Sequence, residues 1–215
     1  MLHIDQLSFA YKETPVLRDL SLQVARGDAV LIRGASGCGK STLLRLLARL
    51  EAPQRGSILL DGIDVTTIPA PAYRRRVAYL QQLPVMVEGS IRDNLLLAFR
   101  YAGDPPPDDG DLRMQLAEVE LQDITLDAAA TELSVGQKQR LALLRLLSMH
   151  PDVLLLDEPT ASLDSTSAAQ LMNVVKRQLD AHALTLLIVS HQDLPFEERR
   201  LRLLHMREGH LEEHA

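Results

Sequence analysis

The chain has 215 residues, of which 46% are hydrophobic and 24% are charged, enough to bury one sizeable core with at most a small inserted subdomain. The net charge of −6 argues against a general nucleic-acid-binding protein, which needs clustered Lys and Arg, so no nucleic-acid partner is expected. No apolar run approaches the ~20 residues that cross a bilayer, the N-terminus lacks a signal-peptide pattern, and the single Cys38 cannot form an internal disulfide. We therefore expect a cytoplasmic protein, for which any membrane role would require a separate partner.

Two strand patterns are visible along the chain. The first thirty residues alternate apolar and polar positions, which predicts antiparallel strands. Three short and nearly continuous apolar runs follow, at Ala29–Ile32, Val153–Leu156 and Leu184–Val189, with helical patterns between them. This second pattern predicts a parallel sheet buried on both faces, as in α/β proteins. Ligands of open α/β sheets bind beyond the carboxyl ends of the strands, so we expect the ends of the three runs to meet at one site.

The first apolar run leads into GASGCGKST, which fits the phosphate-binding pattern G-x-x-x-x-G-K-[ST]. Glycines let successive backbone N–H groups point at phosphates, and the helix that begins near Gly39 adds the positive end of its dipole. Lys40 is expected to contact the β- and γ-phosphates of ATP, and the Ser41 hydroxyl to ligate Mg²⁺. A glycine-rich turn without a ligand is the alternative, but the strand before the loop and the helix after it favour phosphate binding. The residues expected to bind the nucleotide here are Gly34, Ala35, Ser36, Gly37, Cys38, Gly39, Lys40, Ser41 and Thr42.

The strand pattern disappears between about Pro84 and Arg140. Ser90–Phe99 and Asp111–Leu121 have helical patterns, and the Pro- and Asp-rich loop Gly103–Gly110 separates them. We therefore expect residues 84–140 to form a small helical insert in a nucleotide-binding α/β core made of residues 1–83 and 141–215.

The second and third apolar runs end in residues that are suited to catalysis. Adjacent strand residues point to opposite sides, so Asp157 and Glu158 should have different roles. Asp157 is suited to hold Mg²⁺ through water, and Glu158 to polarise the attacking water as general base. An acidic turn without a catalytic role is the alternative. His191 follows the third run, where it would contact the γ-phosphate and orient the water, although a lone histidine is more often structural.

The segment Leu133–Arg140, LSVGQKQR, resembles the LSGGQ signature of ATP-binding cassette (ABC) proteins and, as in that family, precedes the Asp–Glu strand. Ser134 and Gln137 also form the pattern of a helix capping box, and both interpretations can hold together. In the family, this helix N-terminus faces the nucleotide of a second cassette, which implies that Ser134, Val135, Gly136 and Gln137 contact that nucleotide. Val135 replaces the first glycine, so a close backbone approach or a positive φ would be harder there.

Further motifs follow the order of the same family. Tyr11 resembles the aromatic residue that stacks on adenine, and a tyrosine at a strand end is the alternative. Gln82 matches the Q-loop glutamine, which in the family senses Mg²⁺, with Gln81 as the neighbouring candidate. Ala161–Asp164, ASLD, resembles the D-loop that crosses the dimer interface, where Asp164 would lie close to the nucleotide.

The resemblance covers nearly the whole chain and implies an α/β fold of the P-loop NTPase (RecA-like) type. In this fold, a parallel core sheet carries an N-terminal antiparallel β subdomain and an inserted helical subdomain. The resemblance also implies that two copies pair head to tail as an ATP-dependent homodimer that binds ATP and Mg²⁺ and hydrolyses ATP. The catalytic residues implied are Lys40, Gln82, Glu158 and His191, the last as the switch histidine, and the metal-site residues implied are Ser41, Gln82 and Asp157.

As a function, the resemblance implies the ATPase subunit of an ABC transporter, on the cytoplasmic face of the inner membrane. A separate integral membrane permease would dock near residues 82–99. The apolar residues Leu83, Val85, Met86 and Val87 precede GSIRDNL, a pattern that resembles export-type cassettes. The alternative is a loop that packs on the chain's own helices.

The short chain is similar to bacterial exporter cassettes, in particular to the Fet-type iron-exporter cassettes, although cytochrome-maturation and lipoprotein-release cassettes are comparably short. A soluble ABC ATPase that acts in translation or DNA repair is the main alternative function. A P-loop small-molecule kinase would leave LSVGQKQR unexplained. A purely structural nucleotide-binding module is disfavoured by the presence of Glu158.

Overall fold

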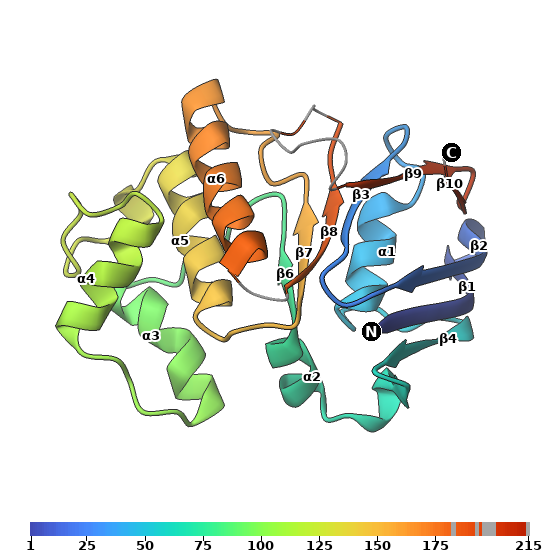
Figure 1. Cartoon of the computed structure of the whole chain (residues 1–215), viewed down its shortest axis with the longest axis horizontal. Coiled ribbons are helices and arrows are strands. Elements are labelled where there is room, and N and C mark those ends of the chain that lie inside the picture. The colour runs from blue at the N-terminus through green and yellow to red at the C-terminus, as the bar shows by residue number, and fades with distance from the viewer. Residues whose placement is uncertain (182–183, 192–193, 195–200, 214–215) are drawn as a thin grey trace.

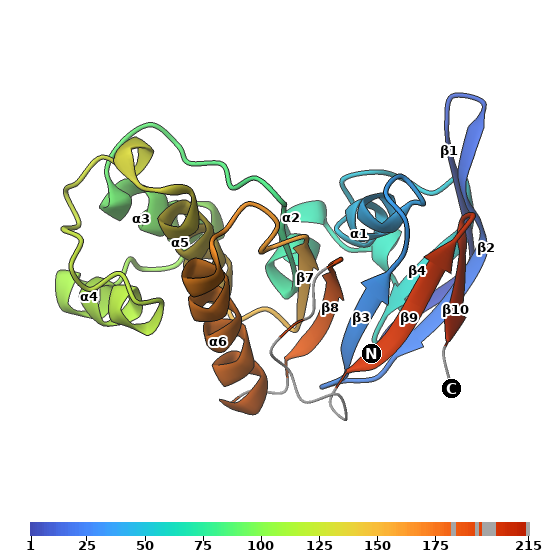
Figure 2. The ribbon, with the colours of Figure 1, turned by 90° about the horizontal axis from the view of Figure 1, so that it is seen from above.

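The computed structural model describes residues 1–181, 184–191, 194 and 201–213. Two β-sheets lie on either side of helix α1 (Lys40–Leu47), and the longer helices lie beyond the larger sheet (Figure 1). Seen from above, α3 (Ile91–Ala102) and α4 (Asp109–Glu118) stand at the opposite end of the molecule from the smaller sheet (Figure 2). Among the described residues, no helix combines the length and the apolar character that a membrane span requires.

The larger sheet has six strands in the order β10-β9-β3-β8-β7-β6. These strands are β3 (Ala29–Arg33), β6 (Val77–Leu80), β7 (Val153–Asp157), β8 (Thr185–Val189), β9 (Arg202–Arg207) and β10 (His210–Glu213). Strands β9, β3, β8, β7 and β6 pair in parallel, whereas β10 pairs antiparallel with β9 at the edge. The three apolar runs of the sequence form β3, β7 and β8. The sequence did not reveal β6, which has only four residues, or β9, which carries Arg and His among its apolar residues.

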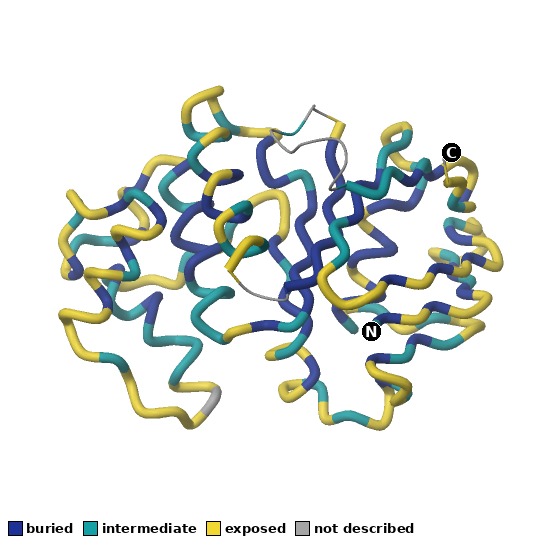
Figure 3. Tube along the Cα trace, viewed as in Figure 1, coloured by how far each residue is buried: buried dark blue, intermediate teal, exposed yellow. Residues whose placement is uncertain are grey.

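Successive residues of the central strands enter two different cores. Val30 and Ile32 of β3 pack into the core that surrounds α1, whereas Leu31 packs into the core beneath the helices on the other face. In β7, Leu155 belongs to the first core and Leu154 to the second. The strands therefore run through the most buried part of the molecule, as the dark central segments of Figure 3 show. Burial on both faces explains why these strands are nearly continuous apolar runs.

The smaller sheet is antiparallel, with the strand order β2-β1-β4-β5. Its strands are β1 (Leu2–Tyr11), β2 (Thr14–Val24), β4 (Arg55–Leu60) and β5 (Ile63–Asp64). Leu2 lies opposite Val24 on one side and Leu60 on the other. All three side chains are buried in the core around α1. The predicted fold class, an α/β P-loop core with an antiparallel β subdomain, is confirmed.

Residues 84–140 carry helices α3 and α4, the short helix η2 (Ala130–Glu132) and the beginning of α5 (Val135–Leu147). Side chains cap the N-termini of α3 and α4. Ser90 and Asp93 form a capping box at α3, and the Asp108 carboxylate accepts a hydrogen bond from an α4 backbone N–H. Helix α5 continues past residue 140 and shares one core with α3, α6 (Ser165–Ala181) and the sheet. The division of the chain at 83/84 and 140/141 therefore stays a prediction. The remaining helices are α2 (Ala70–Arg76) and the short η1 (Val65–Thr67).

A ring of ion pairs joins the two sheets at the end opposite the strand ends that carry the catalytic candidates. Arg76, at the end of α2, donates to Asp152 at 2.6 Å and to Asp61 at 2.5 Å. Arg26 reaches the same two carboxylates at 3.3 Å. The hydrogen bond from Arg76 holds the pKa of Asp61 below its usual range. The network connects four separate segments of the chain, which gives it more weight than an isolated surface pair.

We predict that Arg76→Met lowers the free energy of unfolding by about 1 kcal/mol at pH 7 and low salt, because the side chains are partly exposed and screened. The Asp61 contribution is fully present above the ~3.9 of an unfolded aspartate. It disappears as the pH falls through the lower pKa of the folded state. Urea unfolding at neutral and acidic pH measures the difference. Arg75→Met, which removes an exposed pair with Asp104 outside this network, is the matched control. An Arg76→Met deficit that stayed the same at both pH values would contradict this assignment.

Candidate functional site

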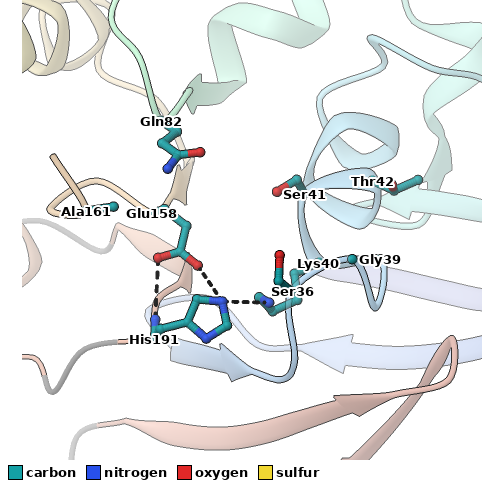
Figure 4. Close-up of a pocket in the computed structure, with 10 residues that line it drawn as sticks. Ser36, Gly39, Lys40, Ser41, Thr42, Gln82, Glu158, Ala161 and His191 are labelled. Atoms are coloured by element: carbon teal, nitrogen blue, oxygen red, sulfur yellow. Dashed lines mark hydrogen bonds and ion pairs between the residues drawn. The ribbon is translucent and has the colours of Figure 1, made fainter.

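One cavity of about 380 Å³ lies at the carboxyl ends of the parallel strands. Figure 4 shows that its residues come from the loops after β3, β6, β7 and β8 and from the first turn of α1, and that Gln82, Glu158, His191 and Lys40 surround a common space. The lining residues are Ser36, Gly37, Gly39, Lys40, Ser41, Thr42, Gln82, Glu158, Ala161 and His191. The structure therefore brings together three strand ends from the sequence analysis, and adds the end of β6.

The loop before α1 is shaped to surround an anion. Gly39 has φ +110°, and a Cβ there would lie 2.9 Å from Leu17 Cδ2, so only glycine fits this position. Helix α1 begins at the next residue, Lys40. The buried Lys40 Nζ donates to the carbonyls of Gly34 at 2.8 Å and Ala35 at 2.9 Å. A positive charge and a helix N-terminus thus face the same cavity, which is the arrangement that binds phosphate groups.

The oxygen atoms suited to Mg²⁺ lie beside this loop. The Ser41 hydroxyl donates to Asp157 Oδ1 at 2.8 Å, and the Tyr79 hydroxyl donates to Asp157 Oδ2 at 2.8 Å. Burial raises the pKa of Tyr79, which keeps this donor protonated. The described residues contain no group of three or more His, Cys, Asp or Glu side chains placed to hold a metal. A hydroxyl and a carboxylate nevertheless fit Mg²⁺, which takes oxygen ligands and completes its shell with water and phosphate oxygens.

Glu158 and His191 form a second polar group in the cavity. Glu158 follows β7 with φ +47°, and its N–H donates to the Val189 carbonyl at 2.9 Å. His191 Nε2 lies 3.1 Å from Glu158 Oε1 and 3.1 Å from Lys40 Nζ (Figure 4). One ring nitrogen cannot donate to the carboxylate and accept from the ammonium at the same time. The protonation of Nε2 therefore selects which of the two neighbours His191 binds.

Several residues expected at the site do not line the cavity. These are Tyr11, Gly34, Ala35, Cys38, Ser134, Val135, Gly136, Gln137, Asp157 and Asp164. Gly34, Ala35 and Cys38 belong to the phosphate loop, and Asp157 lies behind Ser41. Tyr11 is 45% exposed and packs edge to face on Phe9, with ring centroids 4.9 Å apart. Sequence reasoning missed Tyr79, since the adjacency of β6 and β7 that places it next to Asp157 is a tertiary feature.

The beginning of α5 has the predicted capping box. The Ser134 hydroxyl accepts from the Gln137 N–H at 3.2 Å, and Gln137 Oε1 accepts from the Ser134 N–H at 2.9 Å. Val135 is the first residue of α5, is 48% exposed and has no positive φ. The backbone at this position therefore requires no glycine, and the N-terminus of α5 stays accessible.

Gly136, by contrast, lies against α6. A Cβ on Gly136 would lie 2.8 Å from Ser167 Oγ and 2.9 Å from Ser167 Cβ. Ser167 is tied in turn to Asp164, whose carboxylate accepts from its N–H at 3.0 Å and from its hydroxyl at 2.7 Å. The backbone N–H of Ser167 lowers the pKa of Asp164. Gly136 of LSVGQ thus packs on Ser167, and Ser167 is hydrogen-bonded to Asp164 of ASLD, so the two segments meet within one chain.

The fold and the cavity define a P-loop ATPase. The sequence pattern of the ABC transporter family matches residues 17–161, which is more than half of the chain, and the chain belongs to that family. It therefore carries the ATP-binding and ATP-hydrolysing cassette of ABC proteins.

Known relatives differ in length and organisation. Protein STAR1 of Oryza sativa subsp. japonica is 43% identical over 176 residues, covering 82% of this chain and 51% of that protein. The chain thus spans about half the length of this relative. The probable iron export ATP-binding protein FetA of Escherichia coli is 33% identical over 191 residues, covering 89% of this chain and 84% of that protein. A bacterial Atm1-family ABC exporter with ATP bound matches with a TM-score of 0.84 and 27% identity, covering 99% of this chain and 38% of that one.

We predict that Gly136→Ala lowers the free energy of unfolding by about 1–3 kcal/mol, because the new methyl group overlaps Ser167. A loss of stability would identify the overlap with Ser167, since replacing glycine by alanine in a helix without such an overlap raises the free energy of unfolding by about 1 kcal/mol. Val135→Ala is the matched control and should stay within about 0.5 kcal/mol of the native protein. Denaturant midpoints of the three proteins test this. A Gly136→Ala protein as stable as the Val135→Ala protein would contradict the contact with Ser167.

Proposed function

We propose that the chain is the ATPase subunit of an ABC transporter, that it works as a head-to-tail homodimer, and that it drives a separate integral membrane permease. The observation that carries the pairing is the position of the signature. Ser134–Gln137 begins a well-capped, accessible helix, yet it does not line the chain's own cavity. A helix N-terminus of this kind binds phosphate groups. In a head-to-tail pair, it would close over the nucleotide of the second copy, with Asp164 beside it.

In this proposal, the cavity residues divide the work of hydrolysis. Lys40 binds the β- and γ-phosphates, and Glu158 accepts a proton from the water that attacks the γ-phosphorus while the bond to ADP breaks. His191 orients Glu158 and the water. Mg²⁺, when bound, would neutralise phosphate charge. Ser41 and Asp157 would hold it, with Gln82 as the sensor at the end of β6.

Tyr11 is the proposed adenine contact. Its ring is 45% exposed at the end of β1, so it is free to stack on a base. The ring packs edge to face on Phe9, which fixes its plane.

The permease would dock on the loop that precedes α3. Leu83, Val85 and Val87 are 64%, 60% and 44% exposed, and exposed apolar side chains gathered in one short segment mark interaction sites. Met86 points the other way and packs on the core beneath the helices. Residues 82–99 thus combine an outward apolar stripe with an inward anchor, which favours docking over a loop packed only on its own helices.

The proposed location is the cytoplasmic face of the bacterial inner membrane, and the proposed direction is export. The likeness to FetA, whose name describes iron export, supports a metal as cargo. The likeness to an Atm1-family exporter supports the same direction. A soluble role in translation or DNA repair would leave the apolar stripe without a partner.

We predict that Glu158→Gln binds ATP but hydrolyses it about 10²–10⁴-fold more slowly, because the general base is lost while its size is kept. With Mg²⁺ and ATP, the variant should accumulate as a dimer. Phosphate release and sedimentation velocity measure the two effects. Glu213→Gln, which alters a carboxylate of similar size in β10, is the control. A Glu158→Gln protein that turned over ATP at the native rate would refute the assignment of the base.

A further inference from the structure

The segment 81–87 links the nucleotide cavity to the apolar stripe. It leaves β6 at Leu80, lines the cavity with Gln82, and presents Leu83, Val85 and Val87 to solvent before α3 begins. A segment in this position can be attached either to β6 and the sheet or to the helices, and it would move with whichever part holds it. Its hydrogen bonds decide between these two possibilities.

Asn94 of α3 holds the far end of the segment. Its side chain is fully buried, and its Oδ1 accepts from the Val87 N–H at 2.9 Å. Its Nδ2 donates to the Val87 carbonyl at 2.9 Å and to the Ser90 carbonyl at 3.0 Å. One buried amide thus satisfies both backbone groups of Val87, which fixes the direction of this residue.

Arg145 of α5 holds the middle of the segment. Its Nη2 donates to the Val85 carbonyl at 3.0 Å, and its Nη1 lies 3.5 Å from Asn94 Oδ1. Burial lowers the pKa of Arg145, and none of the ion pairs in the described part of the chain includes this residue. A half-buried charge without a carboxylate must be satisfied by hydrogen bonds, so its geometry is strongly restrained.

Gln139, on the same helix, reaches the near end. It is 1% exposed, and its Nε2 lies 3.5 Å from the Gln81 carbonyl. Its Oε1 is buried without a hydrogen-bond partner among the described residues. A contact at this distance is weak. The firm attachments are therefore those of Arg145 and Asn94, at the part of the segment that carries the apolar stripe.

We propose that Arg145 and Asn94 are positioning residues that fasten the apolar stripe Leu83–Val87 to the helices rather than to β6, Arg145 to the signature helix α5 and Asn94 to its neighbour α3. When the N-terminus of α5 closes on a nucleotide in the second copy, the stripe moves with the helix. This inference rests on the proposed pairing of two cassettes. Arg145 and Asn94 would thus couple nucleotide binding to the surface where the partner docks, although neither side chain lines the nucleotide cavity or belongs to the stripe.

The chain contains no Trp, so a single Trp at position 83 would report on the stripe alone. Leu83→Trp replaces a 64% exposed side chain, whereas the hydrogen bonds of Arg145 and Asn94 to this segment go to Val85 and Val87. In Glu158→Gln protein carrying Leu83→Trp, addition of Mg²⁺ and ATP should change the Trp emission. The emission change should follow dimer formation in the same samples. Absence of any change in a protein that dimerises would overturn the inference.

Arg145→Met keeps the length of the side chain and removes its donors, and Asn94→Ala removes the other attachment. Each should abolish most of the emission change while the ATP affinity and the ATP-dependent dimer stay at the level of the parent. Arg74→Met is the matched control, because Arg74 also donates to backbone carbonyls, at Ala48 and Arg49, but far from the stripe. Arg74→Met should retain the full response.

The outcomes distinguish the role of Arg145 and Asn94 from the pairing of two cassettes. A full emission change in both Arg145→Met and Asn94→Ala would overturn the inference and leave the pairing intact. A parent protein that forms no dimer with ATP would contradict the proposed function itself. If Arg145→Met proves too unstable to purify, Asn94→Ala decides alone, because it removes both hydrogen bonds to Val87.

Discussion

The arrangement of the site depends on the alternating burial of side chains along the central strands. Because β3, β7 and β8 pack into a core on each face, their register against one another is fixed, and so are the positions at which they end. Gly34 and Glu158 directly follow β3 and β7, and His191 is the second residue after β8. These strand ends converge on one site, although Gly34 lies more than a hundred residues before the other two. A slip of one residue in any strand would exchange its core faces. Strand register therefore sets the distances among Lys40, Glu158 and His191.

A second constraint lies at the contact between α5 and α6. Gly136 is the residue at which the signature helix approaches Ser167, and Ser167 is bonded to Asp164. The LSVGQ and ASLD segments therefore belong to one packed unit on the helical side of the sheet. The phosphate loop belongs to the other side, next to α1. In the proposed function these two regions are two halves of a nucleotide site that face different spaces, so a second copy of the chain completes each site.

The strands and motifs that depend only on neighbouring residues could be predicted from the sequence. Ala29–Ile32, GASGCGKST and the Ser134–Gln137 capping box each follow from residues close together in the chain. Strand β6, the contact of Tyr79 with Asp157 and the inward orientation of Met86 could not be predicted, because each depends on which strand or helix packs against that residue in the fold. The replacement at Val135 illustrates the same limit. Only the packing of α6 shows that the following glycine, and not this one, is needed. The hydrogen bonds of Asn94 and Arg145 to the segment 81–87 could not be predicted either, since asparagine and arginine in helices are usually on the surface.

The central claim is that each active site is shared between two chains, and mixing two inactive variants tests it most directly. Lys40→Ala disables the phosphate loop, and Ser134→Arg blocks the signature, so each variant alone should release no phosphate from ATP. In an equal mixture, mixed dimers contain one site with an intact phosphate loop and an intact signature, and about a quarter of the native ATPase rate should return. A mixture as inactive as its components, although mixed dimers form, would contradict the shared site.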